Sequence, residues 1–362
     1  MKFLLIRERN FELHQPVSNL KLLLQSNIID FKMRKTGNKE EPVVPISIDS
    51  NVSVKELVDS LGNADAFNAG RLYEAAKVFE TMLRGDALVF TSIAGALIPA
   101  GMGGLICNMI RKGQIDVIVS TGANIYHDTH MALGRPFYKG SWDVDDVSMR
   151  KEGKDRVYDI YAKEKDMIEL DDLLCGEIFP EIRNLESPST AEFHYELGRQ
   201  IKKKAEDASN SVLVQAYEHK VPIFCSSPGD SSIGMDLSKY NYFLNPERPI
   251  KIDVDRDVVQ STGLTLLIKS LGALILGGGS PKNFTLQTQP MLEQILGIKD
   301  WGLDYVIQFT VDTPQYGGLS GATPHEAISW GKIKPHMRDN LIVVYGDVTI
   351  LLSLLACFAS GI

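Results

Sequence analysis

The sequence has few cysteines, and no two of them lie at a metal-binding or redox spacing. Its 362 residues contain four cysteines and no Cys-x-x-Cys motif. Isolated thiols in apolar surroundings are typical of a reducing compartment, so we expect a cytoplasmic protein without a zinc cage. The four are Cys107, Cys175, Cys225 and Cys357.

The chain also lacks an excess of positive charge. Lysine and arginine number 38 against 46 aspartates and glutamates, which gives a formal net charge of -8. Binding to nucleic acid without sequence preference needs a cationic surface that displaces counterions from phosphates. We therefore expect cations or small molecules as partners, and no nucleic acid.

Long apolar runs are missing as well. Near the N-terminus only residues 3–6 are continuously apolar before Arg7, which is too short for a signal-peptide core. Residues 341–362 are apolar but contain Asp347, and a charge at the centre of a bilayer costs about 2.5–3.5 kcal/mol. We predict a buried strand and a buried helix there, and no membrane association.

Several catalytic signatures are absent. No Gly-x-Ser-x-Gly or Cys/His signature supports a hydrolase, and no Gly-x-Gly-x-x-Gly fingerprint marks a dinucleotide site. His127 and His130 lie at helical spacing but lack a recognisable third ligand, so we expect no metal. We place His127 near a bound cofactor and His130 at a partly buried helix position.

What the chain does contain is an alternation of short apolar segments with helix-like segments. Apolar residues make up 44% and charged residues 23%, as in an ordinary soluble globular protein. Such alternation predicts the α/β class, with a doubly wound parallel sheet covered by helices on both faces, and a Rossmann-like domain. The expected strands are residues 87–91, 116–120, 222–225, 273–276, 305–311 and 341–345.

The organisation along the chain is simple. Residues 1–45 have no clean period, and we interpret them as an N-terminal extension of uncertain order, followed by a single domain over residues 46–362. Residues 143–165 form a polar, charge-rich interruption without predicted strands. Capping boxes predict helix starts at Ser53–Glu56, Ser189–Glu192 and Thr323–Glu326.

Small and polar residues follow four of the expected strands, at residues 121–124, 228–232, 277–280 and 346–347. Ligands of open parallel sheets bind at the carboxyl ends of the strands, and glycines there let the backbone approach a ligand. Ser280 would open a helix whose free N–H groups face a pyrophosphate, while Asp230 and Asp347 suit ribose hydroxyls. The alternative is that these loops are only tight turns.

One lysine, Lys332, stands beside Trp330 and directly after Gly331. Burial against an aromatic ring disfavours the ammonium form and lowers the pKa of a lysine, which makes Lys332 a candidate nucleophile. The alternative is a surface lysine that complements the dipole at a helix C-terminus.

Three blocks resemble the deoxyhypusine synthase family, in the family's order and across about residues 60–360. They are Gly-Gly-Gly-x-Pro-Lys at 277–282, Ser-Gly-Ala-x-Pro-x-Glu-Ala-x-Ser-Trp-Gly-Lys at 320–332, and the strand end at Asp347. The resemblance implies a homotetramer with active sites at a dimer interface and NAD at the strand ends. It implies transfer of a 4-aminobutyl group from the polyamine spermidine, through an imine of the active-site lysine, to an acceptor protein lysine or, in homospermidine synthases, to putrescine.

Matched position by position, the resemblance makes Lys332 the covalent nucleophile. It assigns substrate binding to Trp330, Glu326, Asn283, Gly317 and Asp236. It assigns NAD contacts to Gly95, Thr121, Gly122, His127, Asp230, Gly278, Gly279, Ser320 and Asp347.

Three positions depart from the family pattern. Asn283 replaces a histidine that acts on the polyamine, and Leu319 and Met235 replace aspartates that hold its amino groups, with Asp236 next to the second of them. Each lost charged hydrogen bond costs about 1.5–3 kcal/mol, so triamine binding should weaken. The sequence therefore predicts a deoxyhypusine synthase-like branch, which leaves the donor amine and the acceptor (protein lysine or small diamine) open. A non-catalytic NAD-binding protein and a plain amine dehydrogenase are the alternatives.

Overall fold

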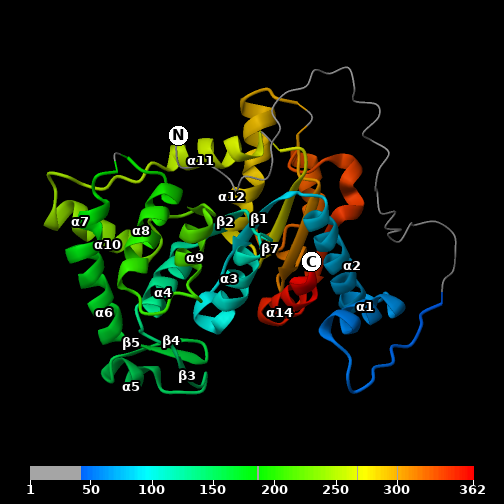
Figure 1. Cartoon of the computed structure of the whole chain (residues 1–362), viewed down its shortest axis with the longest axis horizontal. Helices are drawn as coiled ribbons and strands as arrows, with labels where there is room; N and C mark the ends of the chain where they lie inside the picture. The colour runs from blue at the N-terminus through cyan, green and yellow to red at the C-terminus, as the bar shows by residue number, and fades with distance from the viewer. Residues whose placement is uncertain (1–41, 186, 267, 300) are drawn as a thin grey trace.

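The centre of the molecule is a six-stranded parallel sheet (Figure 1). The computed structural model describes residues 42–362 except 186, 267 and 300, so most of the expected 1–45 extension lies outside the described residues. The strands run in the order β6-β2-β1-β7-β8-β9, the doubly wound order that reverses between β1 and β7. Their bounds are β1 Leu88–Ile93, β2 Val117–Ser120, β6 Ile223–Cys225, β7 Leu271–Leu276, β8 Tyr305–Thr310 and β9 Leu341–Tyr345. The predicted fold class is confirmed.

Alternate residues of each strand feed two separate cores, because successive side chains of a strand point to opposite faces. On β1, Val89 and Ile93 belong to one buried cluster, and Leu88 and Phe90 belong to the other. Helices α2 (Phe67–Arg84), α3 (Gly103–Arg111) and α14 (Val348–Phe358) contribute to the first cluster. Helices α11 (Val254–Thr265) and α12 (Gly279–Pro290) contribute to the second.

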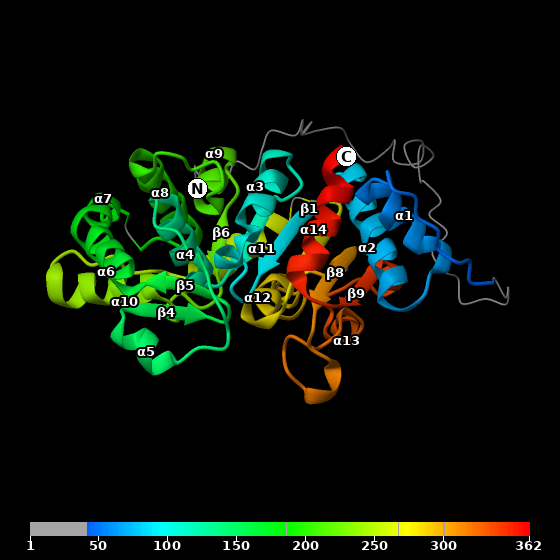
Figure 2. The same cartoon turned by 90° about the horizontal axis from the view of Figure 1, so that it is seen from below.

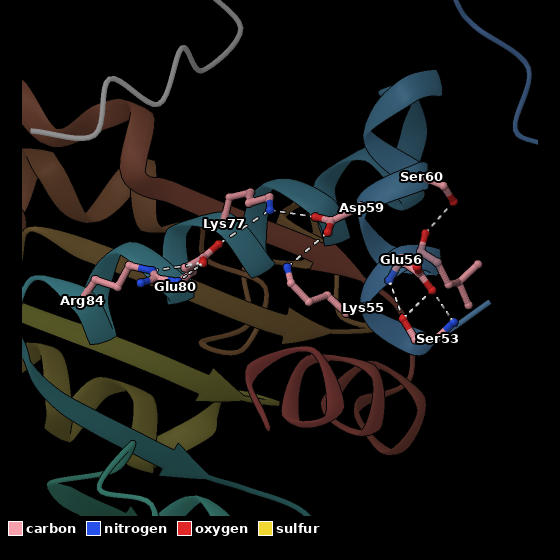
Figure 3. Close-up of polar contacts among 9 residues, drawn as sticks. Ser53, Lys55, Glu56, Asp59, Ser60, Lys77, Glu80 and Arg84 are labelled. Carbon is pink, nitrogen blue, oxygen red and sulfur yellow. Dashed lines mark hydrogen bonds and ion pairs between the residues drawn. The ribbon is translucent and has the colours of Figure 1, made fainter. Parts of the chain in front are cut away.

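Two of the three predicted capping boxes form completely. The Ser53 hydroxyl accepts the N–H of Glu56, and the Glu56 carboxylate accepts the N–H of Ser53, which starts α1 (Val54–Ala64) (Figure 3). Residues 189–192 start α8 (Thr190–Lys204) in the same way. At the third, the Thr323 hydroxyl accepts the N–H of Glu326. In the described part of the chain, the Glu326 carboxylate does not accept the N–H of Thr323 in return. The predicted helix start is confirmed, but the predicted bond to the Glu326 carboxylate was wrong, because this carboxylate faces a pocket.

Helix α1 is tied to α2 by charged side chains as well as by packing (Figure 3). Asp59 of α1 pairs with Lys77 of α2 at 2.7 Å, while the Lys55–Asp59 pair at 3.2 Å lies within α1 and the Arg84–Glu80 pair at 2.9 Å lies within α2. Partly exposed ion pairs of this kind contribute about 0–1 kcal/mol each. The fully buried Val58 of α1 therefore anchors the helix more firmly than these pairs do.

A second sheet, which the sequence analysis did not predict, lies at one end of the molecule (Figures 1 and 2). It is antiparallel and consists of β3 (Tyr138–Lys139), β5 (Ile160–Lys163) and β4 (Lys154–Val157), beside α5 (Asp146–Lys151) and α6 (Glu164–Leu173). Residues 143–165, which were expected only as a polar, charge-rich interruption, contain α5, β4 and β5. These strands are short and carry charged side chains, so they show no alternation that marks a half-buried strand.

The apolar C-terminal stretch forms the strand β9 and the helix α14, as predicted. Leu352, Leu355 and Phe358 of α14 are buried in the first core cluster. Within the described ranges, no helix has both the length and the apolar character needed to cross a membrane. The remaining α-helices are α4 Gly122–Ala132, α7 Phe179–Ile182, α9 Val212–His219, α10 Ser232–Lys239 and α13 Pro324–Ala327.

Candidate active site

The carboxyl ends of all six parallel strands meet at one edge of the sheet, so the four loops noted in the sequence lie along that edge. At the point where the strand order reverses, Gly95 follows β1 and the loop Gly277–Gly279 follows β7. We call Gly277–Gly279 the glycine loop. Gly95 has a φ of +73° and open space where a Cβ would lie, so a ligand can approach its backbone closely.

The glycine loop lies directly against Ser320. A Cβ on Gly278 would lie 2.5 Å from Ser320 Cα, and the N–H of Gly279 donates to Ser320 Oγ at 3.0 Å. Gly279 has a φ of +61°, which favours glycine. Backbone contact between the two segments therefore requires the small residues that the sequence places there.

Two helices begin at this edge without a side-chain cap. Thr121 precedes α4 and Gly278 precedes α12, and neither residue caps its helix with a side chain, although Ser320 Oγ accepts the N–H of Gly279 at the start of α12. Free N–H groups at a helix start bind phosphate oxygens. Asp230 lies exposed after β6, while Asp347 is exposed but accepts the N–H of Thr349 as the cap of α14. The edge thus fits a dinucleotide.

His127 and His130 lie on α4, and the ring of Phe137 packs against both of them. Burial lowers the pKa of each histidine to about 4, so both are uncharged at neutral pH. His130 is fully buried rather than partly buried as predicted. The described residues contain no group of three or more side chains arranged to hold a metal.

Asp128, between the two histidines, has a structural role that the sequence did not reveal. Its carboxylate accepts bonds from Ser211 Oγ at 2.7 Å and from the N–H groups of Val212 and Leu213 at 2.8 and 2.9 Å, at the start of α9. Burial raises its pKa to about 6, and these three donors oppose that shift.

Substituting Asp128→Asn should lower the free energy of unfolding by about 2 kcal/mol, because an amide cannot accept from all three donors in place of the charged carboxylate. Urea denaturation would measure this. Asp145→Asn, at the exposed cap of α5, is the matched control and should change stability by less than about 0.5 kcal/mol. Equal effects of the two substitutions would contradict the argument.

Lys332 leaves the end of a short helical segment and points into a pocket of about 420 Å³. Gly331 before it has a φ of +65°, and Glu293 Oε2 would lie 2.4 Å from a Cβ at that position. Lys332 Nζ donates to Asn283 Oδ1 at 3.2 Å and lies 5.8 Å from the centre of the Trp330 ring. Burial lowers the pKa of Lys332, and Glu326 opposes that shift. The Lys332 side chain is thus half-buried in a pocket, and it is not a surface lysine at the end of a helix.

The pocket gathers four of the predicted catalytic and substrate residues. Asn283 comes from α12, Glu326 from α13, and Trp330 and Lys332 from the segment after α13. Leu319 lies on the wall, where the family resemblance implies an aspartate. The lining carries one carboxylate, Glu326, and two lysines, Lys282 and Lys332, and its other residues are apolar or neutral.

Two other predicted substrate residues do not line this pocket. Gly317 is exposed on the loop between β8 and α13, which projects from the body of the molecule (Figure 2). Asp236, on α10, is 5% exposed. Burial and the adjoining Asp171 carboxyl raise the pKa of Asp236 to about 7, and Tyr126 donates to Asp171 at 2.6 Å. Within one chain, the Asp236 side chain therefore faces the interior.

Sequence reasoning missed Lys282, which was part of a motif but received no role. It lies in the first turn of α12, is 2% exposed, and donates to Gln308 and to the backbone carbonyls of Leu319, Ser320 and Ala322. A lysine placed one turn after a glycine loop was the available signal. Its acceptors, far along the chain, could not be identified from spacing.

Comparisons with known proteins point to one family. The family model described as "Deoxyhypusine synthase" matches residues 56–358. A "Deoxyhypusine synthase-like protein" of Nostoc punctiforme is 40% identical over 331 residues, which cover 88% of this chain and 82% of that protein. "Probable deoxyhypusine synthase 2" of Methanosarcina acetivorans is 40% identical over 318 residues, 87% of this chain and 88% of that protein. The crystal structure of "a putative deoxyhypusine synthase from Entamoeba histolytica" has a TM-score of 0.56 at 15% identity, over 86% and 94% of the two chains, and so shares the fold.

Proposed function

The chain belongs to the deoxyhypusine synthase family, and from that membership we propose that it is an NAD-dependent aminobutyl transferase. Spermidine is the default donor, and the acceptor is a protein lysine or a small diamine such as putrescine. The observation that carries the proposal is the half-buried Lys332 amine, held by Asn283 beside Trp330 in a pocket whose wall adjoins the glycine loop.

The strand-end edge would hold the cofactor. NAD, when bound, supplies the hydride acceptor and donor that interconversion of amines and imines requires. The glycine loop and the start of α4, where Thr121 makes no side-chain cap, support this assignment. The residues proposed to contact it are Gly95, Thr121, Gly122, His127, Asp230, Gly278, Gly279, Ser320 and Asp347.

The proposed reaction passes through an imine of Lys332. Oxidation removes a hydride and a proton from the donor, and the uncharged Lys332 amine adds to the resulting imine carbon. With spermidine as the donor, collapse of this adduct expels 1,3-diaminopropane and leaves a 4-aminobutyl imine on Lys332. The acceptor amine then displaces Lys332 by the same addition and elimination, and reduction of the product imine returns the hydride.

The other pocket residues bind and orient. The Glu326 carboxylate suits one ammonium of the donor, and the Trp330 ring suits a cation above its face. Asn283 Oδ1 accepts an N–H of Lys332 and so fixes the direction of the amine. Asparagine cannot take a proton at neutral pH, so Asn283 positions the nucleophile and does not act as a base.

The proposal extends to assembly and compartment. A homotetramer with sites at a dimer interface would let the exposed Gly317 contact substrate bound to a neighbouring subunit, whereas the buried Asp236 side chain would first have to turn outward. The four cysteines are unpaired, three of them buried, which supports a reducing cytoplasmic compartment.

Leu319→Asp should tighten spermidine binding about tenfold, because a second carboxylate on the pocket wall would pair with a second ammonium. Michaelis constants for spermidine and putrescine would measure the change. Leu319→Asn has a similar size without the charge, and it should leave both constants within about twofold. Equal gains for the two variants would show that charge at residue 319 is not what limits triamine use.

Intact-protein mass spectrometry tests the function directly. The protein is incubated with NAD and spermidine, treated with borohydride and weighed, and a mass gain of one aminobutyl group is expected. Net release of NADH without an adduct would favour an amine dehydrogenase, since the transferase cycle returns its hydride. If a panel of spermidine, putrescine and agmatine gives neither adduct nor NADH while NAD still binds, the non-catalytic alternative replaces the proposal.

A further inference from the structure

Lys282 is a buried lysine surrounded by acceptors. Its Nζ donates to Gln308 Oε1 at 3.1 Å, to the carbonyls of Leu319 and Ser320 at 3.3 and 3.4 Å, and closely to the carbonyl of Ala322. Gln308 Nε2 donates to the carbonyls of Gly277 and Ser320, which turns its Oε1 toward Lys282.

This geometry suits the ammonium form of Lys282 better than the uncharged amine. All four neighbouring atoms are acceptors, and an ammonium has three N–H donors and no lone pair. An uncharged amine would point a lone pair at one of these oxygens. Lys282 therefore carries a positive charge that its hydrogen bonds hold in place.

The fixed charge lies beside the proposed nucleophile. Asn283, the next residue, accepts the bond from Lys332 Nζ, and both lysines line the same pocket. The other titratable groups here are Glu326 on α13 and Glu293, whose carboxylate lies against Gly331. Burial lowers the pKa of Lys282 to about 8, Glu326 opposes that shift, and the positive charge of Lys332 adds to it. Burial is the main cause of the lowered pKa of Lys332, and repulsion from a second ammonium in the same pocket would act in the same direction.

We propose that Lys282 is a positioning residue for Lys332, a fixed ammonium that disfavours a second positive charge on the neighbouring amine and so keeps that amine nucleophilic. Lysines beside another cationic group are activated in this way. This inference rests on the proposed function only for the reaction that the Lys332 amine performs. The effect of the Lys282 charge on that amine does not depend on it.

Competitive labelling with acetic anhydride over a series of pH values tests the inference, with Lys332 followed by peptide mass spectrometry. In Lys282→Met, labelling of Lys332 at neutral pH should fall about tenfold, and its midpoint should move to higher pH. Gln308→Met is the matched control, since it breaks the same hydrogen-bond network and leaves the charge of Lys282. It should leave the midpoint unchanged.

A second uncharged variant guards against a failure to fold. Lys282→Gln can still donate to the carbonyls of residues 319–322, and it should show the same fall in labelling. The inference is overturned if Lys282→Met or Lys282→Gln folds and its Lys332 is labelled as in the wild type. It is also overturned if Gln308→Met moves the pH midpoint of Lys332 labelling as far as Lys282→Met does. Labelling needs neither NAD nor a donor amine, so its outcome is independent of whether the transfer reaction is found.

Discussion

Lys332→Ala should abolish the borohydride-trapped adduct and lower turnover by about a thousandfold or more, because the other lysine that lines the pocket, Lys282, is held by its acceptors as an ammonium. Lys332→Arg should fail equally, since a guanidinium keeps the charge but is never deprotonated. The measurement is intact-protein mass together with the rate of 1,3-diaminopropane release.

Binding of NAD serves as the control for these two variants. The contacts of Lys332 Nζ are with Asn283 and the Trp330 ring, not with the glycine loop, so NAD affinity should stay within about threefold of the wild type. An adduct of aminobutyl mass on Lys332→Ala would place the covalent step on another residue. If the variant loses both NAD binding and adduct formation, the substitution has disturbed the whole site.

Gly278→Ala should lower NAD affinity by about a hundredfold. The added Cβ would lie 2.5 Å from Ser320 Cα and 2.6 Å from its Cβ. Ser320 cannot move away easily, because its hydroxyl accepts from Gly279 and its carbonyl accepts from Gln308 at 2.7 Å. Separation of the two segments should also lower the free energy of unfolding by about 1–3 kcal/mol.

The matched control for this substitution is Gly318→Ala. A Cβ on Gly318 meets no heavy atom within 4 Å, although the residue lies two positions from Ser320. Calorimetric titration with NAD and urea denaturation would compare the two variants. If Gly278→Ala binds NAD like the wild type, the glycine loop does not hold the cofactor.

Local signals predicted the helix starts and the strands of the main sheet. The boxes at Ser53–Glu56 and Ser189–Glu192 form because each bond joins residues three apart, so no distant contact decides them. The strands were visible because both faces of a parallel sheet are buried, which leaves short continuous apolar runs. The half-formed box at Thr323–Glu326 shows where a pocket overrode the local preference.

The hydrogen-bond partners of buried polar side chains could not be predicted from the sequence, because these partners lie far along the chain. The acceptors of Lys282 lie 26 to 40 residues away, and the donors to Asp128 lie 83 to 85 residues away. Residue type showed that these side chains can form strong hydrogen bonds but not with which groups. The small sheet was missed for another reason, since Tyr138–Lys139 is too short and exposed to carry a pattern.

The Asn283–Lys332 contact is an intermediate case. The family resemblance placed both residues in one site, but it assigned Asn283 only to substrate binding. The structure adds that Asn283 holds the lysine itself at 3.2 Å. That contact needed the relative placement of α12 and the segment after α13, which no sequence spacing specifies.

The pocket wall at residues 319–322 is held by its main chain. Lys282 and Gln308 bind the carbonyl oxygens of Leu319, Ser320 and Ala322, and they make no hydrogen bond with the Leu319 side chain. Every amino acid supplies the same carbonyl, so residue 319 can change without loosening the scaffold. If the proposed function holds, single substitutions at residue 319 can therefore alter the amine preference of the pocket while the neighbouring glycine loop keeps its backbone contacts.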